Sequence, residues 1–280
     1  SWWVTLHGHG EPCIAEAIGH QAKEREQVIF ANFRHGPAST LSTRLCGKWD
    51  GLDRMLFSDN GSTAAEGALK LAWQHCQRDA PERQQVIAFD GAYHGDTFGA
   101  MALGERGLFS APFEPLLFAV ARAPWPATWW GDGEIEQKEA QAPQRLDELL
   151  QTPTAAVIFE PLLQGAGGMA MVRETFLQAV EQRAHAAGAL VIADEVLTGF
   201  GRSGSLFACQ RADIAPDIVS LSKGLTAGFL PMGVTLASEA LYQSFVGPEP
   251  DRTFFHGHSF TANPLGCAAA VASLELLERE

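Results

Sequence analysis

The residues with the clearest chemical potential are three charged side chains, each of which comes directly after a short run of apolar residues. They are Glu160, Asp194 and Lys223, and the runs before them are residues 155–159, 189–193 and 218–222. Continuous apolar runs of this length predict strands that are buried on both faces. Because ligands of open parallel sheets bind outside the carboxyl ends of the strands, we expect the three side chains to meet at one edge of a sheet.

Lys223 and Asp194 together have the chemistry of a pyridoxal phosphate site. A lysine at the end of a buried strand loses hydration, which favours its neutral amine, and a neutral amine condenses with an aldehyde. The pyridoxal ring withdraws electrons while its nitrogen keeps a proton, and a carboxylate holds that proton in place. Each residue alone has a simpler explanation, because a lysine can extend to solvent and an aspartate can cap a turn. The pair at neighbouring strand ends favours the cofactor.

Residues 59–63 predict a phosphate site at the start of a helix. They join a predicted strand to a predicted helix, and exposed N–H groups at a helix start attract anions. Gly61 lets an anion approach the backbone, and Ser62 adds a hydroxyl donor. Thr63 and Glu66 have the spacing of a capping box, so we expect them to cap the helix and to leave Gly61 and Ser62 free.

Helical and strand patterns alternate along the chain, which predicts an α/β fold. Apolar residues at helical spacing occur in residues 13–18, 65–76 and 176–184, and short continuous apolar runs lie between them. Such alternation predicts a mostly parallel central sheet flanked by helices. Residues 121–144, rich in proline, glycine and charge, predict an exposed loop or insertion. Tyr93, in the turn after the run at residues 86–89, has a ring that can stack on a cofactor.

Composition excludes several classes of protein. The chain has 280 residues, of which 46% are hydrophobic, and its formal net charge is -13. This charge argues against a general nucleic-acid binder or a binder of anionic membranes. The cysteine count is five, with no C-x-x-C pair, which favours reduced thiols in a cytoplasmic enzyme. No apolar run approaches the length of a membrane span, and no signal peptide is visible.

Other motifs suggest alternatives that fit less well. Residues 199–204 spell G-x-G-x-x-G, which makes a nicotinamide-dinucleotide-binding oxidoreductase the alternative from a different class. That fingerprint must follow a strand directly and open a helix, whereas residues 194–198 intervene here. The pairs His7/His9 and His256/His258 lack a third ligand at usual spacing, so no metal site is predicted.

Motifs along the whole chain resemble those of the class III aminotransferases, which have the fold type I of pyridoxal phosphate enzymes. The motifs common to the class are Asp194-Glu195, Ser222-Lys223 and Asn263-Pro264-Leu265. Two further motifs, Trp2-Trp3 and the Tyr-His-Gly-Asp-Thr-Phe-Gly of residues 93–99, resemble more narrowly the members that act in biotin synthesis. The resemblance implies that residues 1–280 are the cofactor-binding large domain of a longer chain, without its N-terminal segment and C-terminal small domain.

The resemblance also implies roles at the cofactor. Lys223 would bind pyridoxal 5'-phosphate covalently and then transfer a proton, Asp194 would pair with the ring nitrogen, and Tyr93 would pack on the ring. These three are the expected catalytic residues. Glu160 is expected close to the cofactor.

The phosphate and the substrates have expected partners as well. Gly61 and Ser62 would hold the phosphate, while His258 and Ser259 would reach the phosphate bound by the second subunit. The active unit is therefore expected to be a homodimer with shared active sites. The expected lining of the substrate pocket is Trp2, Tyr93, Asp96, Arg202, Lys223 and Gly257.

The reaction implied by the resemblance is the transfer of an amino group from S-adenosylmethionine to 8-amino-7-oxononanoate, which gives 7,8-diaminononanoate for biotin. Lysine is an alternative donor. Another class III transaminase acting on omega-amino acids is an alternative with the same chemistry.

Overall fold

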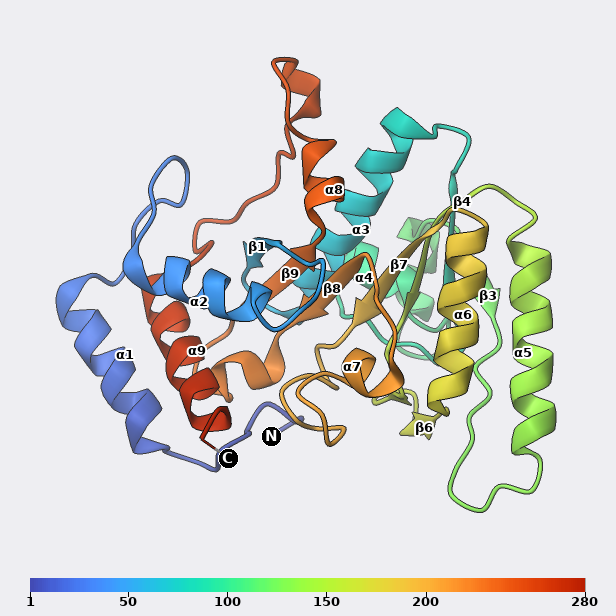
Figure 1. Cartoon of the computed structure of the whole chain (residues 1–280), viewed down its shortest axis with the longest axis horizontal. Helices are drawn as coiled ribbons and strands as arrows, with labels where there is room; N and C mark the ends of the chain where they lie inside the picture. The colour runs from blue at the N-terminus through green and yellow to red at the C-terminus, as the bar shows by residue number, and fades with distance from the viewer. Residues whose placement is uncertain (280) are drawn as a thin grey trace.

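A seven-stranded sheet forms the centre of the molecule in the computed structural model, which describes residues 1–279 (Figure 1). The strand order is β1-β9-β8-β7-β4-β2-β3, and every neighbouring pair is parallel except the two pairs made by β9. A separate ribbon pairs β5 with β6. The strands are β1 (Arg54–Ser58), β2 (Gln85–Phe89), β3 (Ala121–Ala123), β4 (Thr154–Phe159), β5 (Leu163–Gln164), β6 (Ala170–Met171), β7 (Leu190–Asp194), β8 (Ile218–Leu221) and β9 (Gly233–Ala237). The predicted mostly parallel α/β fold is confirmed.

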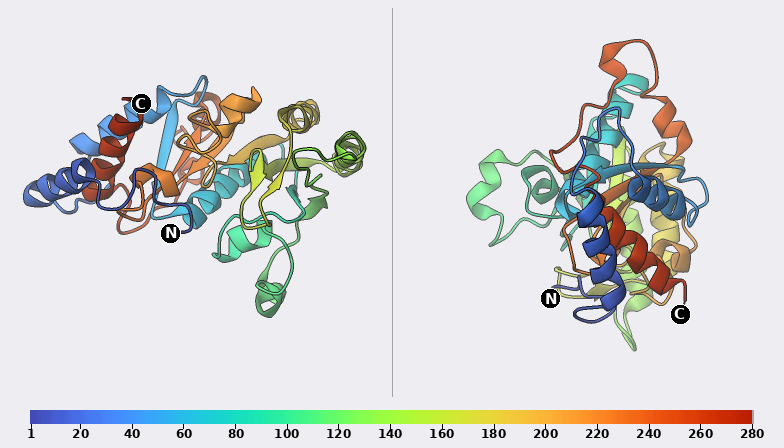
Figure 2. Two further views of the ribbon diagram at one scale, coloured as in Figure 1. Left: turned by 90° about the horizontal axis from the view of Figure 1, so that it is seen from below. Right: turned by 90° about the vertical axis from the view of Figure 1, so that its left-hand side faces the viewer.

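Helices cover both faces of this sheet, as the edge-on views show (Figure 2). Helix α3 packs against one face, whereas α2, α6 and α9 lie over the other, with α5 packed beside α6. The α-helices are α1 (Pro12–Glu24), α2 (Gly36–Cys46), α3 (Gly61–Asp79), α4 (Phe98–Leu103), α5 (Ile135–Leu149), α6 (Glu174–Ala186), α7 (Ala208–Ala212), α8 (Glu239–Gln243) and α9 (Pro264–Leu277). The 3-10 helices are η1 (Ala111–Leu116), η2 (Lys223–Thr226) and η3 (Pro250–Arg252).

The central strand β4 is apolar after its first residue, Thr154, and its burial explains why. All of its residues are buried, and successive side chains point to opposite faces of the sheet. Val157 and Phe159 join the core under α6, while Ala156 and Ile158 join the core under α3. A strand covered on both sides has no position where a polar side chain reaches water, so its first charged residue, Glu160, comes where the strand ends.

The prediction of a loop over residues 121–144 is wrong at both ends. Residues 121–123 form the edge strand β3, and residue 135 begins helix α5, which contains Pro143. Packing of Ala142 and Leu146 in the core outweighs the unfavourable proline. Between the two elements Trp125 is buried, and its indole donates to the carbonyl of Ala170.

No helix in residues 1–279 is both long enough and apolar enough to cross a membrane.

Candidate active site

The structure brings Lys223, Asp194 and Glu160 to one edge of the sheet, as expected from the apolar runs before them. They follow or end the neighbouring strands β8, β7 and β4, and all three line a cavity of about 1020 Å³. The start of α3, the turn at residues 91–96 and the segment at residues 2–4 form further parts of its wall. Parallel strands end at the same edge, and this geometry explains how residues far apart in sequence converge.

Lys223 begins the short helix η2, directly after β8. Burial lowers the pKa of its ammonium group, an effect opposed by the negative charges of Asp194 and Glu160. Its Nζ lies 5.8 Å from the centroid of the Trp3 ring, so one side of the amine faces an aromatic surface. The lowered pKa increases the fraction of neutral amine, which is the form that attacks a carbonyl carbon.

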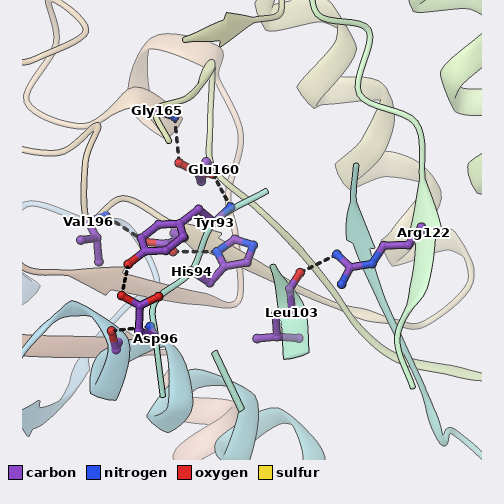
Figure 3. Close-up of polar contacts among 10 residues, drawn as sticks. Tyr93, His94, Asp96, Leu103, Arg122, Glu160, Gly165 and Val196 are labelled. Carbon is purple, nitrogen blue, oxygen red and sulfur yellow. Dashed lines mark hydrogen bonds and ion pairs between the residues drawn. The ribbon is translucent and has the colours of Figure 1, made fainter. Parts of the chain in front are cut away.

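Asp194 is held by two donors on opposite oxygens. The Nδ1 atom of His94 lies 2.7 Å from Oδ2, and the backbone N–H of Val196 donates to Oδ1 over 3.0 Å (Figure 3). A carboxylate only accepts, so the His94 ring must carry its proton on Nδ1. The Nε2 atom of His94 is buried without a partner in residues 1–279. His94 stands inside the 93–99 motif, but its sequence context alone predicts no role for it.

Glu160 is a buried carboxylate with two backbone donors, the N–H groups of Tyr93 and Gly165, at 3.0 and 3.1 Å (Figure 3). Burial is the largest influence and raises the pKa of Glu160 to about 7. The nearby charge of Asp194 adds to this rise, while His94 and the two N–H donors oppose it. Glu160 therefore ties the turn that carries Tyr93 to the loop that follows β4.

Tyr93 and Asp96 form a hydrogen-bonded pair on the cavity wall. The Tyr93 hydroxyl donates to Oδ2 of Asp96 over 2.9 Å (Figure 3). Burial, followed by the bond to Asp96, raises the pKa of Tyr93 to about 12, so its hydroxyl keeps its proton at neutral pH. The ring is partly exposed toward the cavity.

Helix α3 begins at Gly61, and the prediction of its capping residues is wrong. Asn60 is the N-cap, and it forms a reciprocal capping box with Thr63 rather than Thr63 forming one with Glu66. The cap uses the N–H of Thr63, which leaves those of Gly61 and Ser62 without intrahelical acceptors. A side chain at residue 61 would lie 2.8 Å from Cγ1 of Val196, so glycine is required there for close packing.

Packing on α3 explains the two glycines of the 93–99 motif. Gly95 has a φ of +134°, and a Cβ at this residue would collide with Oγ of Ser62. A Cβ at Gly99 would meet the carboxylate of Glu66, which accepts the N–H of Gly99 and so anchors the start of α4. The capping box predicted for Glu66 was wrong because its side chain points across to α4.

Arg122, on strand β3, fixes the far end of α4. Its guanidinium donates to the carbonyl of Leu103 (Figure 3). It also donates to the carbonyls of Ala102 and Gly104 at the end of that helix. A cation suits a helix C-terminus, where carbonyl groups lack intrahelical donors. The next residues, 104–105 and 107–110, line the cavity, so Arg122 supports this wall.

The remaining expected substrate residues divide into two groups. Trp2 and Asp96 line the cavity. Arg202 stands behind that wall, where its guanidinium donates to the carbonyls of Trp3 and Leu197 over 2.9 and 3.0 Å. Gly257 lies outside the cavity lining of this chain.

His258 and Ser259 also lie outside the cavity lining, where the segment that follows η3 enters a turn at Ser259. The Nδ1 atom of His258 lies 3.0 Å from Oδ2 of Asp59, one residue before the N-cap of α3. The carbonyl of Ser259 accepts a hydrogen bond from the amide of Gln27.

The G-x-G-x-x-G at residues 199–204 does not have the context of a dinucleotide site. Phe200 and Gly201 both have positive φ, and the segment is a succession of turns between β7 and the five-residue helix α7. A dinucleotide fingerprint needs a helix that opens within the motif, so that the pyrophosphate meets its N–H groups. The oxidoreductase alternative is therefore not supported.

Comparisons with known proteins agree with this geometry. The family model of class III aminotransferases matches residues 1–280, and the chain belongs to that family. Class III aminotransferases depend on pyridoxal phosphate. An adenosylmethionine-8-amino-7-oxononanoate aminotransferase of Synechococcus elongatus is 59% identical over 99% of this chain, and one of Geobacter sulfurreducens is 42% identical over 99%.

Solved structures show the same fold. The crystal structure of the adenosylmethionine-8-amino-7-oxononanoate aminotransferase of Methanocaldococcus jannaschii has a TM-score of 0.90, 32% identity and coverage of 99% of this chain. A pyridoxal-phosphate-bound amine transaminase of an uncultivated Pseudomonas species has a TM-score of 0.92 and 31% identity, also over 99%. This chain spans 66% and 63% of the lengths of the Synechococcus and Geobacter relatives, and 63% and 65% of the two solved chains.

The residues present fit the cofactor of this family. The cavity has a lysine amine at one end of a strand and a buried carboxylate at the end of the next. Two free N–H groups and a hydroxyl stand at the start of α3, where a phosphate is stabilised. Gly61 and Gly95 leave room beside them that a larger side chain would fill.

Proposed function

We propose that the whole protein transfers an amino group from S-adenosylmethionine to 8-amino-7-oxononanoate, giving 7,8-diaminononanoate in biotin biosynthesis. The observation that carries this proposal is the 59% identity, over 99% of the chain, to a relative named for that reaction. The residues specific to the proposed substrates are those that line the cavity beyond the cofactor, Trp2, Tyr93 and Asp96.

The charge of the cavity supports cationic substrates. Among the residues 1–279 that line it, Lys223 is the only lysine or arginine, whereas Asp96, Glu105, Glu160 and Asp194 are all carboxylic acids. S-adenosylmethionine carries a positive sulfonium, and 8-amino-7-oxononanoate carries an amino group. Carboxylates and aromatic faces stabilise both kinds of cation. Lysine is also a cationic donor, so this feature favours S-adenosylmethionine and lysine over donors with neutral side chains.

We assign the cofactor-binding roles to the residues that converge on the cavity. Lys223 binds pyridoxal phosphate covalently, Asp194 holds the proton of the ring nitrogen, and Tyr93 packs on the ring. Gly61 and Ser62 bind the phosphate. The bound cofactor supplies an electron sink for the carbon that loses its proton.

The protein's own groups perform the proton transfers. Burial lowers the pKa of Lys223 and so favours its neutral amine, which accepts a proton from the substrate carbon and returns it later in the cycle. The bond from His94 keeps the Asp194 carboxylate directed at the site of the ring nitrogen. Tyr93, which remains protonated, holds Asp96 beside the substrate amino group.

We also propose that the enzyme is a homodimer with shared active sites. Residues 104–118 project from the body of the molecule (Figure 2). They carry apolar side chains such as Leu108 and Phe109, which are 86% and 90% exposed and also line the cavity. A second copy that covers this segment removes the apolar surface from water and closes the cavity on that side. In such a dimer His258 and Ser259 approach the phosphate of the second subunit, and Gly257 and Arg202 complete the substrate pocket.

We further propose that residues 1–280 are the large domain of this enzyme and that it acts in the cytoplasm. The proposed reaction consumes S-adenosylmethionine, a cytoplasmic metabolite, and the five cysteines are free thiols in the structure.

The test is an assay of the complete enzyme with 8-amino-7-oxononanoate and one of three donors: S-adenosylmethionine, lysine or an omega-amino acid. We expect 7,8-diaminononanoate with S-adenosylmethionine, and no product with Lys223→Ala. Asp194→Ala should reduce the rate far more than Ser62→Ala, because the phosphate keeps its backbone N–H donors. Product from lysine alone, or from omega-amino acids alone, would reject the proposed donor.

A further inference from the structure

Glu195, the residue after Asp194, is a fully buried carboxylate that the proposed reaction does not use. Its side chain accepts three hydrogen bonds: from the hydroxyl of Thr198 over 2.6 Å, from the N–H of Ala208 over 3.0 Å, and from the N–H of Cys209 over 2.7 Å. No lysine, arginine or histidine of residues 1–279 forms an ion pair with it. Burial of an unpaired carboxylate is unfavourable, so the three donors must offset a large desolvation penalty.

The three donors belong to the two ends of a single loop. Thr198 lies before it, Ala208 and Cys209 lie after it, and the loop between them, residues 199–207, is closed by the carboxylate. Two buried phenylalanines, Phe200 and Phe207, pack their rings against each other inside the loop at 5.6 Å. Glu195 thus holds the two ends of the loop together, and the contact between Phe200 and Phe207 stabilises the residues between them.

This loop carries Arg202, and Arg202 holds the wall of the cavity. Its guanidinium donates one bond within the loop's base, to the carbonyl of Leu197, and one to the carbonyl of Trp3. Within residues 1–279, the bond to Trp3 is the only hydrogen bond that joins residues 1–4 to the rest of the chain. Trp2 and Trp3 line the cavity, and Trp3 faces the amine of Lys223.

We infer that Glu195 is a positioning residue for the substrate side of the cavity, which acts through the 199–207 loop and Arg202 on the backbone of Trp2 and Trp3. Its carboxylate does not touch the cavity, and the contacts of Asp194 to His94 and Val196 do not involve it. Substitution of Glu195 should therefore leave the contacts of Asp194 unchanged. The position of Trp2 and Trp3 in the cavity wall should depend on Glu195.

The test compares Glu195→Gln with Glu139→Gln in the complete, cofactor-loaded enzyme. In Glu195→Gln the NH₂ group replaces one carboxylate oxygen and cannot accept a hydrogen bond. Part of the set of bonds that closes the 199–207 loop is therefore lost. Glu139 is the matched control, because it is a buried glutamate that binds the backbone N–H and the guanidinium of Arg173 and lines neither the cavity nor the loop. Amide hydrogen exchange in the Glu195 variant should accelerate by roughly fivefold or more in residues 199–207 and at Val4, whose N–H donates to the carbonyl of Ser1. The control should change in neither segment.

A kinetic measurement, which rests on the proposed function, gives the second readout. We expect Glu195→Gln to raise KM for the amino donor by roughly tenfold, with kcat within about threefold of the parent. The absorption spectrum of the bound cofactor should not change. In an Arg202→Lys background the substitution should have little further effect on KM, because both act through the same contact.

Three results would overturn the inference. The first is exchange that accelerates in residues 199–207 but not at Val4. The others are increases in KM that multiply when Glu195→Gln and Arg202→Lys are combined, and a loss of activity confined to kcat. If Glu195→Gln does not fold, Thr198→Val serves as the second variant, because it removes one donor to the carboxylate. It should give the same changes in hydrogen exchange and in KM, but smaller ones. If the parent enzyme shows no transamination of the proposed substrates while the exchange pattern holds, then the proposed function fails and the role of Glu195 stands.

Discussion

The hydrogen bond between His94 and Asp194 should control the efficiency of the chemical step. In His94→Phe a ring of similar size remains, but the donor to Oδ2 is lost, and Asp194 keeps only the N–H of Val196. A hydrogen bond to a charged group contributes about 1.5–3 kcal/mol, and both side chains here are almost fully buried, which excludes water as a substitute donor. We therefore expect kcat/KM to fall by about 10- to 100-fold.

The matched variant is His94→Asn, whose side-chain amide nitrogen stands close to the place of the ring Nδ1. It keeps a donor for Asp194 and should recover most of the activity that His94→Phe loses. The measurement is the rate of the first half-reaction, followed by the change in cofactor absorbance after rapid mixing with the amino donor. Equal activity of the parent and His94→Phe, or equal impairment of the two variants, would refute the role of this bond.

Three further predictions concern other parts of the site. The pKa of Glu160 is raised to about 7 from its ordinary 4.5, so the folded state binds this proton more tightly than the unfolded state. The free energy of unfolding of the cofactor-free protein should therefore fall by up to about 3 kcal/mol as the pH rises from roughly 4.5 to 7. Urea titrations at several pH values should show this loss in the parent and not in Glu160→Gln. Gly95→Ala should reduce affinity for pyridoxal phosphate, measured by spectroscopic titration, because the new Cβ collides with Ser62; Gly19→Ala, in open space on α1, should bind the cofactor like the parent. Phe109→Asp should shift the proposed dimer toward monomer in sedimentation velocity, and an unchanged dimer would show that the projecting segment lies outside the interface.

The order of local elements could be predicted from residue pattern because burial constrains composition. A strand covered on both faces is mostly apolar, and the first charged residue after it marks the edge where ligands bind. For this reason Glu160, Asp194 and Lys223 could be placed together before any coordinates. Strand β9 was missed because its antiparallel insertion between β1 and β8 leaves no pattern in its own residues.

Contacts between distant segments were decided only by the tertiary structure. Residue spacing allowed Glu66 to cap its own helix, but the approach of α4 gave its carboxylate better donors, and Asn60 became the cap instead. His94 looked like one residue of a turn until β7 placed Asp194 beside it, 100 residues further along the chain. The sequence by itself determined which residues are apolar, which are charged and where strands end. Only the packing of strands and helices decided which charge meets which donor, because a hydrogen bond depends on distances between atoms that chain order does not specify.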